Sequence, residues 1–349
     1  MIKILIAEDS PVTLEYVKHI LASAGDFEVV STAKDGEKAV AFAQTTGPDV
    51  ILMDINMPRM DGFEATRRIM ETKPVPIVIF SASWNPEDVE KTFKAMEAGA
   101  LTVLEKPAGP GSPDAEHMIR ELLQTLRLMS EVPVVRRWNR QREKPASPGL
   151  PSLKEEVEVS DGTEIVAIGS STGGPSVLNA ILSMLPKDFS APILIVQHIS
   201  EGFQTGLAEW LEKSCYFSVC VARHNNPLEP GHVYMSPDKL HMGVTKEGRI
   251  ALSDAPPENY VRPSVSYLFR SVAREFGRKA AGVLLTGMGK DGANELKLIK
   301  ESGGVTIVQD KESSVVHGMA GEAIKLDAAK YVLTPEKIAA MLASTVSKK

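Results

Sequence analysis

Short apolar runs alternate with helix-like segments in the N-terminal third of the chain. Apolar residues recur at helical spacing from Val12 to Ala22 and from Glu64 to Met70, for example. Parallel strands need crossover connections of about this size, so the alternation predicts a (βα)5 domain with a parallel sheet. The runs expected to form its strands are Ile2–Ala7, Val29–Thr32, Val50–Met53, Ile77–Phe80 and Leu101–Leu104.

A change of composition separates this domain from a second one. Helical spacing continues from Ala115 to Met129, and a basic stretch, Arg136–Lys144, precedes a stretch rich in Pro, Gly and Ser, Pro145–Ser152. The second stretch has the composition of a linker. We interpret the basic stretch as a solvated face rather than an anion-binding patch. We therefore place the first domain at residues 1–124, the linker at 125–161 and the second domain at 162–349.

The second domain again alternates buried-strand and helical patterns. Two further runs, His232–Met235 and Arg249–Ser253, flank turn signals and suggest a β-hairpin beside the sheet. The expected fold is a doubly wound, mostly parallel α/β sheet with this hairpin. The other expected strands are Ile165–Gly169, Ala191–Ile199, Ala281–Leu285 and Val305–Val308, and the expected helices are Ser176–Leu185, Ser264–Phe276 and Asn294–Lys300.

Composition narrows the functional classes. The chain has 349 residues, of which 43% are hydrophobic and 24% charged, as in soluble globular proteins of two domains. Its net charge of −6 disfavours nucleic-acid binding, which calls for a basic domain. No apolar run approaches membrane-spanning length, and the N-terminus lacks a signal-peptide pattern. Cys215 and Cys220 form no disulfide framework, which fits the reducing cytoplasm. Together, these features lead us to expect a cytoplasmic protein with no membrane insertion and no nucleic-acid partner.

Polar side chains follow the strands predicted for the first domain. Glu8 and Asp9 end the first strand, Asp54 the third, Ser81 the fourth and Lys106 the fifth. The carboxyl ends of parallel strands meet at one edge, so three carboxylates are expected to crowd there. Hard oxygen ligands suit Mg²⁺. Asp54 can then attack a phosphoryl donor, while Lys106 and Ser81 hold the phosphoryl oxygens.

This set resembles the receiver domain of two-component response regulators, whose signatures are MDINMPRMDG (Met53–Gly62) and EKP (Glu105–Pro107). The resemblance implies that Asp54 is phosphorylated by a histidine kinase. It also implies that Glu8, Asp9, Asp54 and the backbone carbonyl of Asn56 surround Mg²⁺. Glu8 stands where Asp is usual, and Val103 stands where receivers usually have an aromatic residue that reports phosphorylation.

The turn after Ile165–Gly169 fits the G-x-S-x-G pattern of a nucleophile elbow, with Ser171 at its centre. Such a turn exposes the serine hydroxyl at the end of a sheet, before a helix with free backbone N–H groups. Two alternatives remain for this stretch alone. The glycines can simply form a turn, or the loop can cradle a phosphate.

Two further predicted strands support this interpretation of the turn. His198 lies near the end of Ala191–Ile199, and the loop that contains Asp291 follows Ala281–Leu285. Parallel topology would therefore bring Ser171, His198 and Asp291 to one edge of the sheet. His198 can accept the serine proton, and Asp291 can stabilise the imidazolium. The N–H groups of Thr172 and of the Gly287–Gly289 loop can bind an oxyanion. Taken singly, His198 can be a core histidine and Asp291 a helix cap; their coincidence favours the triad.

The motifs IGSSTGGP, IVQHI, RPSV, LLTGMGKDGA and VVHGMAGEAI resemble the catalytic domain of chemotaxis protein-glutamate methylesterases. The resemblance implies the triad Ser171, His198 and Asp291, with the backbone of Met288 at the oxyanion hole. It implies hydrolysis of glutamyl methyl esters, and deamidation of certain glutamines, on chemoreceptor helices. Ser266 and Ala320 depart from the family's usual Asp and Pro. We interpret both departures as affecting receptor preference rather than the triad.

The sequence thus predicts an esterase controlled by phosphorylation. A histidine kinase is its expected phosphodonor, and methyl-accepting chemoreceptors are its expected substrates. Mg²⁺ is expected to serve phosphorylation only, and hydrolysis is expected to need no cofactor. The resemblance further implies that the unphosphorylated receiver obstructs the active site. The alternative is a non-enzymatic adaptor whose second domain only binds a partner.

Overall fold

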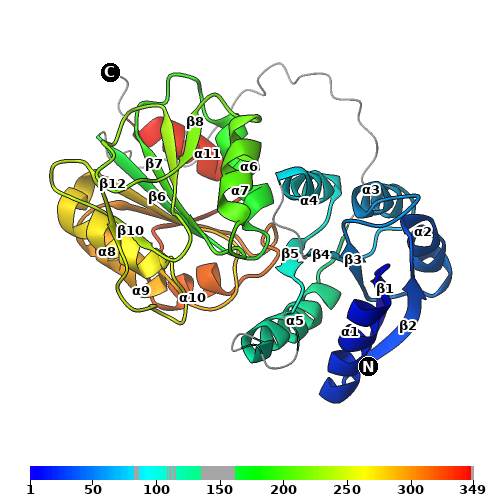
Figure 1. Ribbon diagram of the computed structural model, residues 1–349. Coiled ribbons are helices and arrows are strands. Elements are labelled where there is room, and N and C mark those ends of the chain that lie inside the picture. The colour runs from blue at the N-terminus through cyan, green and yellow to red at the C-terminus, as the bar shows by residue number, and fades with distance from the viewer. Residues whose placement is uncertain (82–85, 108, 110–111, 113–114, 135–161, 347–349) are drawn as a thin grey trace. The chain divides into compact units, whose positions relative to one another are not determined.

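The computed structural model describes residues 1–81, 86–107, 109, 112, 115–134 and 162–346. The chain forms two compact units, Met1–Glu143 and Lys144–Lys349 (Figure 1), and each is treated by itself below. Among the described residues, no helix combines the length and apolar character needed to cross a membrane.

The first unit is built on a five-stranded sheet in the order β2-β1-β3-β4-β5, with every pair parallel. All the strands expected from the apolar runs are present, displaced by at most two residues at their ends. The strand bounds are β1 Ile2–Ala7, β2 Phe27–Ala33, β3 Val50–Asp54, β4 Ile77–Ser81 and β5 Thr102–Glu105.

Helices cover both faces of this sheet (Figure 1). Helices α2, α3 and α4 pack side by side, whereas α1 and α5 contact each other. Each of α1, α2 and α3 starts at a Ser or Asp cap whose side chain accepts a backbone N–H of the first turn. The bounds are α1 Pro11–Ala24, α2 Gly36–Thr45, α3 Gly62–Thr72, α4 Pro86–Ala98 and α5 Ala115–Ser130.

Helix α5 extends beyond residue 124, where the sequence analysis ended the first domain. Leu126 and Met129 are buried in it, so this part of the predicted linker belongs to the packed unit. The basic stretch and the Pro-rich stretch of the predicted linker lie outside the described residues.

The second unit contains a seven-stranded sheet in the order β14-β13-β12-β6-β7-β9-β8. All its strand pairs are parallel. Its central strands are buried along their whole length, which explains why they read as continuous apolar runs. The bounds are β6 Ile165–Ser170, β7 Ile193–Gln197, β8 Ser218–Val221, β9 His232–Met235, β12 Ala280–Leu284, β13 Val305–Gln309 and β14 Tyr331–Leu333.

Two groups of helices flank this sheet (Figure 1). Helix α6 packs against α7 and α11, whereas α9 packs against α8 and α10. The bounds are α6 Gly174–Met184, α7 Phe203–Glu212, α8 Val265–Phe276, α9 Ala293–Glu301, α10 Met319–Lys325 and α11 Pro335–Thr345.

The β-hairpin exists and both predicted strands form, but only one of the two belongs to the hairpin. Strand β9 joins the parallel sheet, and β11 (Ile250–Ser253) pairs antiparallel with β10 (His241–Val244). The sequence analysis missed β10, which contains Gly243. A Cβ at Gly243 would lie 3.1 Å from both Tyr267 and Ser271, so the glycine allows β10 to approach α8 closely.

Both sheets have a point at which the chain reverses its direction of winding. In the first unit it lies between β1 and β3, and in the second between β12 and β6. Ligands of open α/β sheets bind outside the carboxyl ends of the strands at such a point. These two edges hold the residues that the sequence analysis singled out.

Candidate functional sites

Ser171 lies in the tight turn between β6 and α6. Its N–H donates to the carbonyl of Thr286, at 3.0 Å, which ties the turn to the end of β12. Gly173 has a φ of +79° and precedes the first turn of α6. A side chain on Gly173 would meet Val315 at 2.6 Å, so glycine is required there by both conformation and space. The turn therefore presents Ser171 at the carboxyl edge of the sheet.

A buried amide, that of Gln197, connects Ser171 with His198. The Gln197 Nε2 donates to the carbonyls of Ser171, at 2.8 Å, and of His198, at 2.7 Å. The Gln197 Oε1 accepts from the hydroxyl of Ser170 at 2.6 Å. The N–H of His198 also donates to the Ser170 carbonyl, at 2.9 Å. One side chain, only 1% exposed, thus fixes the backbone of both neighbouring strand ends.

Asp291 lies opposite His198. The Nε2 of His198 is 3.0 Å from Oδ2 of Asp291, close enough for an ion pair, although it lacks hydrogen-bond alignment. The carboxylate of Asp291 accepts the N–H groups of Val265 and Ser266, at 2.6 and 3.2 Å. These are the first residues of α8, whose positive dipole end favours an anion.

Two side chains complete the support of Asp291. The hydroxyl of Ser264 donates to Oδ1 at 2.7 Å, and Nδ2 of Asn259 donates to the same oxygen at 2.9 Å. Burial alone would raise the pKa of Asp291, but His198, Ser264 and Asn259 together hold it well below its usual range. Asp291 is therefore an anion throughout the physiological pH range, facing the imidazole of His198.

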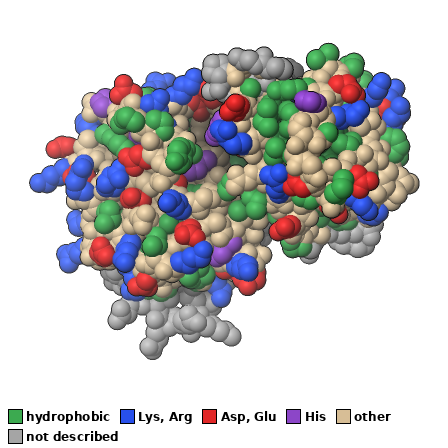
Figure 2. Space-filling model, turned by 90° about the horizontal axis from the view of Figure 1, so that it is seen from below, with side chains coloured by type: hydrophobic (Ala, Val, Ile, Leu, Met, Phe, Trp, Pro, Cys, Tyr) green, Lys and Arg blue, Asp and Glu red, His purple; other side chains and the backbone are tan. Residues whose placement is uncertain are grey.

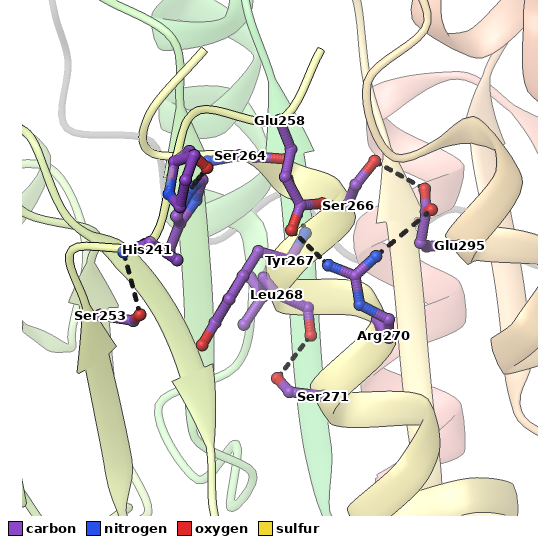
Figure 3. A network of polar contacts seen from close by, with 12 residues as sticks. His241, Ser253, Glu258, Ser264, Ser266, Tyr267, Leu268, Arg270, Ser271 and Glu295 are labelled. Carbon is purple, nitrogen blue, oxygen red and sulfur yellow. Dashed lines mark hydrogen bonds and ion pairs between the residues drawn. The ribbon is translucent and has the colours of Figure 1, made fainter. Parts of the chain in front are cut away.

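The network continues from Ser264 and Ser266, two of the residues that bind Asp291, to further polar side chains (Figure 3). The Ser266 hydroxyl donates to Glu295, at 2.6 Å, and Arg270 lies between Glu295 and Glu258. Ser264 also caps α8 and receives support from His241, whose Nδ1 accepts the Ser264 N–H at 3.2 Å. Polar groups from the loop before α8, from α8 itself and from α9 thus hold the carboxylate in place.

A cavity of about 460 Å³ opens beside this network. His198, Asp291 and Met288 line it, so the predicted oxyanion residue Met288 shares the cavity with two members of the predicted triad. Gly287 lies against Ser171, since a Cβ on Gly287 would come within 2.7 Å of the Ser171 Cβ. The carbonyl of Thr172 accepts the Thr286 hydroxyl at 2.9 Å. The β6 and β12 loops are therefore in direct contact around Ser171.

The first unit has an acidic cluster at its own edge. Ligand oxygens of Glu8, Asp9 and Asp54 lie within 4.8 Å of one another. The Lys106 Nζ lies 2.7 Å from Glu8 and 2.8 Å from Asp54. The N–H of Asn56 donates to Asp54 at 3.3 Å. Ser81 ends the adjacent strand β4 and is buried, so the predicted phosphate-binding residues Ser81 and Lys106 flank the acids.

The electrostatics of this cluster fit a divalent cation. Burial is the main cause of the raised pKa values of Glu8 and Asp54, and the attraction of Lys106 only partly opposes it. Glu8 and Asp54 share a single ammonium group, that of Lys106, so the cluster has a net negative charge when both carboxylates are ionised. Their oxygens, with Asp9 exposed beside them, form the hard donor set that Mg²⁺ prefers.

Comparisons with known proteins identify both domains. The family model "CheB methylesterase" matches residues 166–342, and "Response regulator receiver domain" matches residues 4–113. A relative from Syntrophus aciditrophicus, named protein-glutamate methylesterase/protein-glutamine glutaminase 1, is 54% identical over 98% of this chain and 97% of its own. A relative from Nitrosospira multiformis with the same activities in its name is 53% identical over 100% of this chain and 98% of its own.

The chain belongs to the protein-glutamate methylesterase family. The solved catalytic domain of the Thermotoga maritima methylesterase covers 52% of this chain and 98% of its own, with 39% identity and a TM-score of 0.51. The second unit is thus the methylesterase domain and the first is the receiver domain. The protein is a protein-glutamate methylesterase with glutaminase activity, regulated by phosphorylation in two-component signalling. The comparisons do not favour a non-enzymatic adaptor.

The structure corrects one interpretation of the methylesterase sequence. Ser266 and Ala320 depart from the family pattern, and both departures were interpreted as affecting receptor preference. However, Ser266 is 2% exposed and Ala320 is fully buried, so neither can touch a receptor. Ser266 instead accepts the N–H of Gly292 at 2.9 Å and supports the loop of Asp291. The departure at Ser266 therefore concerns the predicted triad after all.

Three residues of the methylesterase site were missed in the sequence. The sequence pattern that could identify Gln197 is weak: a polar residue before His198 at the end of an apolar strand. The pattern for Ser264 is recognisable, since a serine before an amphipathic helix is a typical helix cap. No sequence pattern identifies Asn259, because its role depends on a loop that contacts Asp291 from 32 residues away.

Proposed function

We propose that Ser171, His198 and Asp291 are the catalytic triad of the methylesterase. The observation that carries this proposal is the approach of the His198 Nε2 to Asp291, 3.0 Å, at the edge where β6 leads into Ser171. Because Nε2 faces the carboxylate, Nδ1 is the nitrogen that accepts the serine proton. This assignment exchanges the two imidazole nitrogens relative to the serine-protease template.

The reaction has two balanced stages. The Ser171 Oγ attacks the ester carbonyl of a glutamyl methyl ester as its proton passes to His198. The N–H groups of Thr172 and Met288 stabilise the oxyanion, and Asp291 stabilises the imidazolium. His198 then protonates the departing methanol. In the second stage His198 takes a proton from water, which attacks the acyl group, and the collapse of the intermediate returns the proton to Ser171 and frees glutamate. Glutamine side chains follow the same course with ammonia as leaving group.

Substitution of the triad tests this proposal. We expect Ser171→Ala and His198→Ala each to lower kcat for glutamyl ester hydrolysis by about 10⁴-fold or more. The double variant should be little slower than either single variant, because the two groups act as one unit. Release of methanol from a methylated receptor measures the rates. Losses that multiply in the double variant would contradict a shared role.

For the receiver domain, we propose phosphorylation of Asp54 by a histidine kinase. Glu8, Asp9, Asp54 and the carbonyl of Asn56 would hold Mg²⁺, which supplies charge neutralisation for phosphoryl transfer. Lys106 and Ser81 would bind the phosphoryl oxygens. The crowding of the acids beside Lys106 supports this assignment.

Labelling with a small phosphodonor and Mg²⁺ tests the receiver assignment. We expect Asp54→Asn to abolish incorporation. Asp49→Asn is the matched control, because Asp49 is an exposed acid just before the same strand and should leave labelling unchanged. Phosphate at similar stoichiometry in Asp54→Asn would show that another residue is the acceptor.

The physiological substrates that we propose are methyl-accepting chemoreceptors, demethylated in the cytoplasm. The family's activity on protein glutamate supports the substrate class. A cytoplasmic location is consistent with Cys215 and Cys220, which are both free thiols.

A further inference from the structure

Tyr260 is an exposed aromatic residue at the rim of the methylesterase cavity. It is 97% exposed, the highest fraction among the exposed large hydrophobic side chains of the described residues. It lines the same cavity as His198 and Asp291. An aromatic ring held in water beside catalytic groups is a typical anchor for a protein partner.

The backbone of Tyr260 adopts a conformation that is rare for residues other than glycine. Asn259 and Tyr260 have φ values of +50° and +68°, a left-handed conformation that is costly for tyrosine. Glu258 and Val261 exchange backbone hydrogen bonds of 2.9 and 3.1 Å around them. This is a two-residue β-turn with both central residues at positive φ, and we call it the 259–260 turn.

Side chains anchor the 259–260 turn on both sides. The Asn259 Nδ2 donates to Asp291 at 2.9 Å and to the Ser266 hydroxyl at 3.1 Å. Glu258 forms an ion pair with Arg270 of α8 at 2.5 Å (Figure 3). These contacts connect the turn directly to the carboxylate that faces His198. The surroundings thus hold Tyr260 in a strained, fully exposed position at a fixed place relative to the active site.

We propose that Tyr260 is a specificity-determining residue that contacts the protein substrate next to the glutamyl ester. The proposal rests on the triad assigned above. The occupant is the polypeptide surface that flanks the ester, because the cavity beneath Tyr260 contains His198 and Asp291. When the ester enters this cavity, the Tyr260 ring packs against apolar side chains on the substrate's helical surface. A small ester has no such surface and gains nothing from the ring.

The test compares two substrates in the full-length protein. One is a receptor methylated on glutamate, and the other is the γ-methyl ester of N-acetylglutamate amide. The variant is Tyr260→Gly, since glycine accepts the positive φ and removes only the ring. Tyr260→Phe retains the ring. Tyr216→Ala is the matched control, because Tyr216 is 63% exposed in another loop and does not line the cavity.

We expect Tyr260→Gly to lower kcat/KM for the receptor about 10- to 100-fold, mainly through KM, and to change the small ester less than about twofold. Tyr260→Phe and Tyr216→Ala should resemble the wild type on both substrates. An equal loss on both substrates would overturn the proposal, since Tyr260 would then act through the triad. Unchanged receptor kinetics would overturn it too.

Ser171→Ala, assayed in parallel, separates this inference from the triad itself. If that variant still hydrolyses both esters, the assigned nucleophile is wrong. The comparison of Tyr260→Gly with Tyr216→Ala still shows in that case whether the ring contacts the receptor.

Discussion

Gln197 occupies the most constrained position around the proposed triad. Its amide is the only group described here that bonds the carbonyls of both Ser171 and His198. The Ser171 carbonyl also accepts the Gly174 N–H, at 2.8 Å, so loss of the Gln197 amide removes one of its two donors. The expected cost is at most about 1–3 kcal/mol at each carbonyl. The side chain never touches the substrate in our proposal, so it acts as a positioning residue for the nucleophile and the base.

Replacing Gln197 with Leu should therefore impair turnover more than binding. We expect kcat to fall about 10- to 100-fold with little change in KM, because the Ser171 and His198 backbones lose their shared donor. Steady-state kinetics on the small glutamyl ester measure this. Gln204→Leu is the control, since Gln204 bonds only the Gln197 carbonyl and lies one step further from the triad. A variant with raised KM and normal kcat would contradict a positioning role.

At the level of elements, the first turn of α8 acts together with His198 to hold Asp291 as an anion. Two of its N–H groups and its cap residue Ser264 bind the carboxylate. Three segments distant in sequence thereby meet: the loop of Asp291, the start of α8 and the 259–260 turn. A helix N-terminus is well suited to hold a permanently ionised orienting group.

The pH dependence of stability should reveal this arrangement. The folded pKa of Asp291 is lower than its unfolded value of about 3.9, so the ionised carboxylate stabilises the fold above that pH. The stabilisation is lost as the pH falls through the lowered pKa. Asp291→Asn should therefore be less stable than the wild type at pH 7, and the difference should shrink below about pH 4.

Urea denaturation between pH 7 and pH 3 measures the difference in free energy of unfolding. Asp238→Asn is a control of opposite sign, because burial is the main cause of the raised pKa of Asp238. Its difference from the wild type should change with pH in the opposite direction. A constant gap between Asp291→Asn and the wild type would contradict the ionic role of the α8 first turn.

At the scale of the whole molecule, two parallel sheets place chemistry at the same kind of position. The acids of the receiver lie at the carboxyl ends of the paired strands β1 and β3, and Ser171 lies at the carboxyl end of β6, which pairs with β12. Charged side chains of both signs are interspersed on the face shown in Figure 2. The acidic cluster and Ser171 thus belong to different units of the chain.

The family resemblance leads us to expect that the unphosphorylated receiver obstructs the esterase. A fragment that starts at Ser160 should then demethylate receptor faster than the unphosphorylated full chain, about 10- to 100-fold if docking contributes about 1.5–3 kcal/mol. Phosphorylation of the full chain should reduce this gap. Because Val103 replaces the usual aromatic reporter, we expect its activation to be smaller than in relatives with the ring. A fragment no faster than the unphosphorylated chain would exclude obstruction and favour active stimulation.

Sequence patterns alone predict the two parallel sheets and the candidate residues at their edges. Buried parallel strands are apolar along their whole length, so the polar residues at their ends stand out, and this signal singles out Asp54, Ser171 and His198 as candidates. These signals are local, since strand and helix periodicity depend on residues close together in the chain.

Which distant segments meet becomes visible in the folded chain. The partner of β11, the burial of Ser266, the clamp by Gln197 and the link from Asn259 to Asp291 all join parts of the chain that no local pattern connects. The sequence also cannot predict which nitrogen of His198 faces Asp291, whereas the structure places Nε2 there. A contact between distant segments depends on packing in three dimensions, and the periodicity of hydrophobic residues contains no information on it.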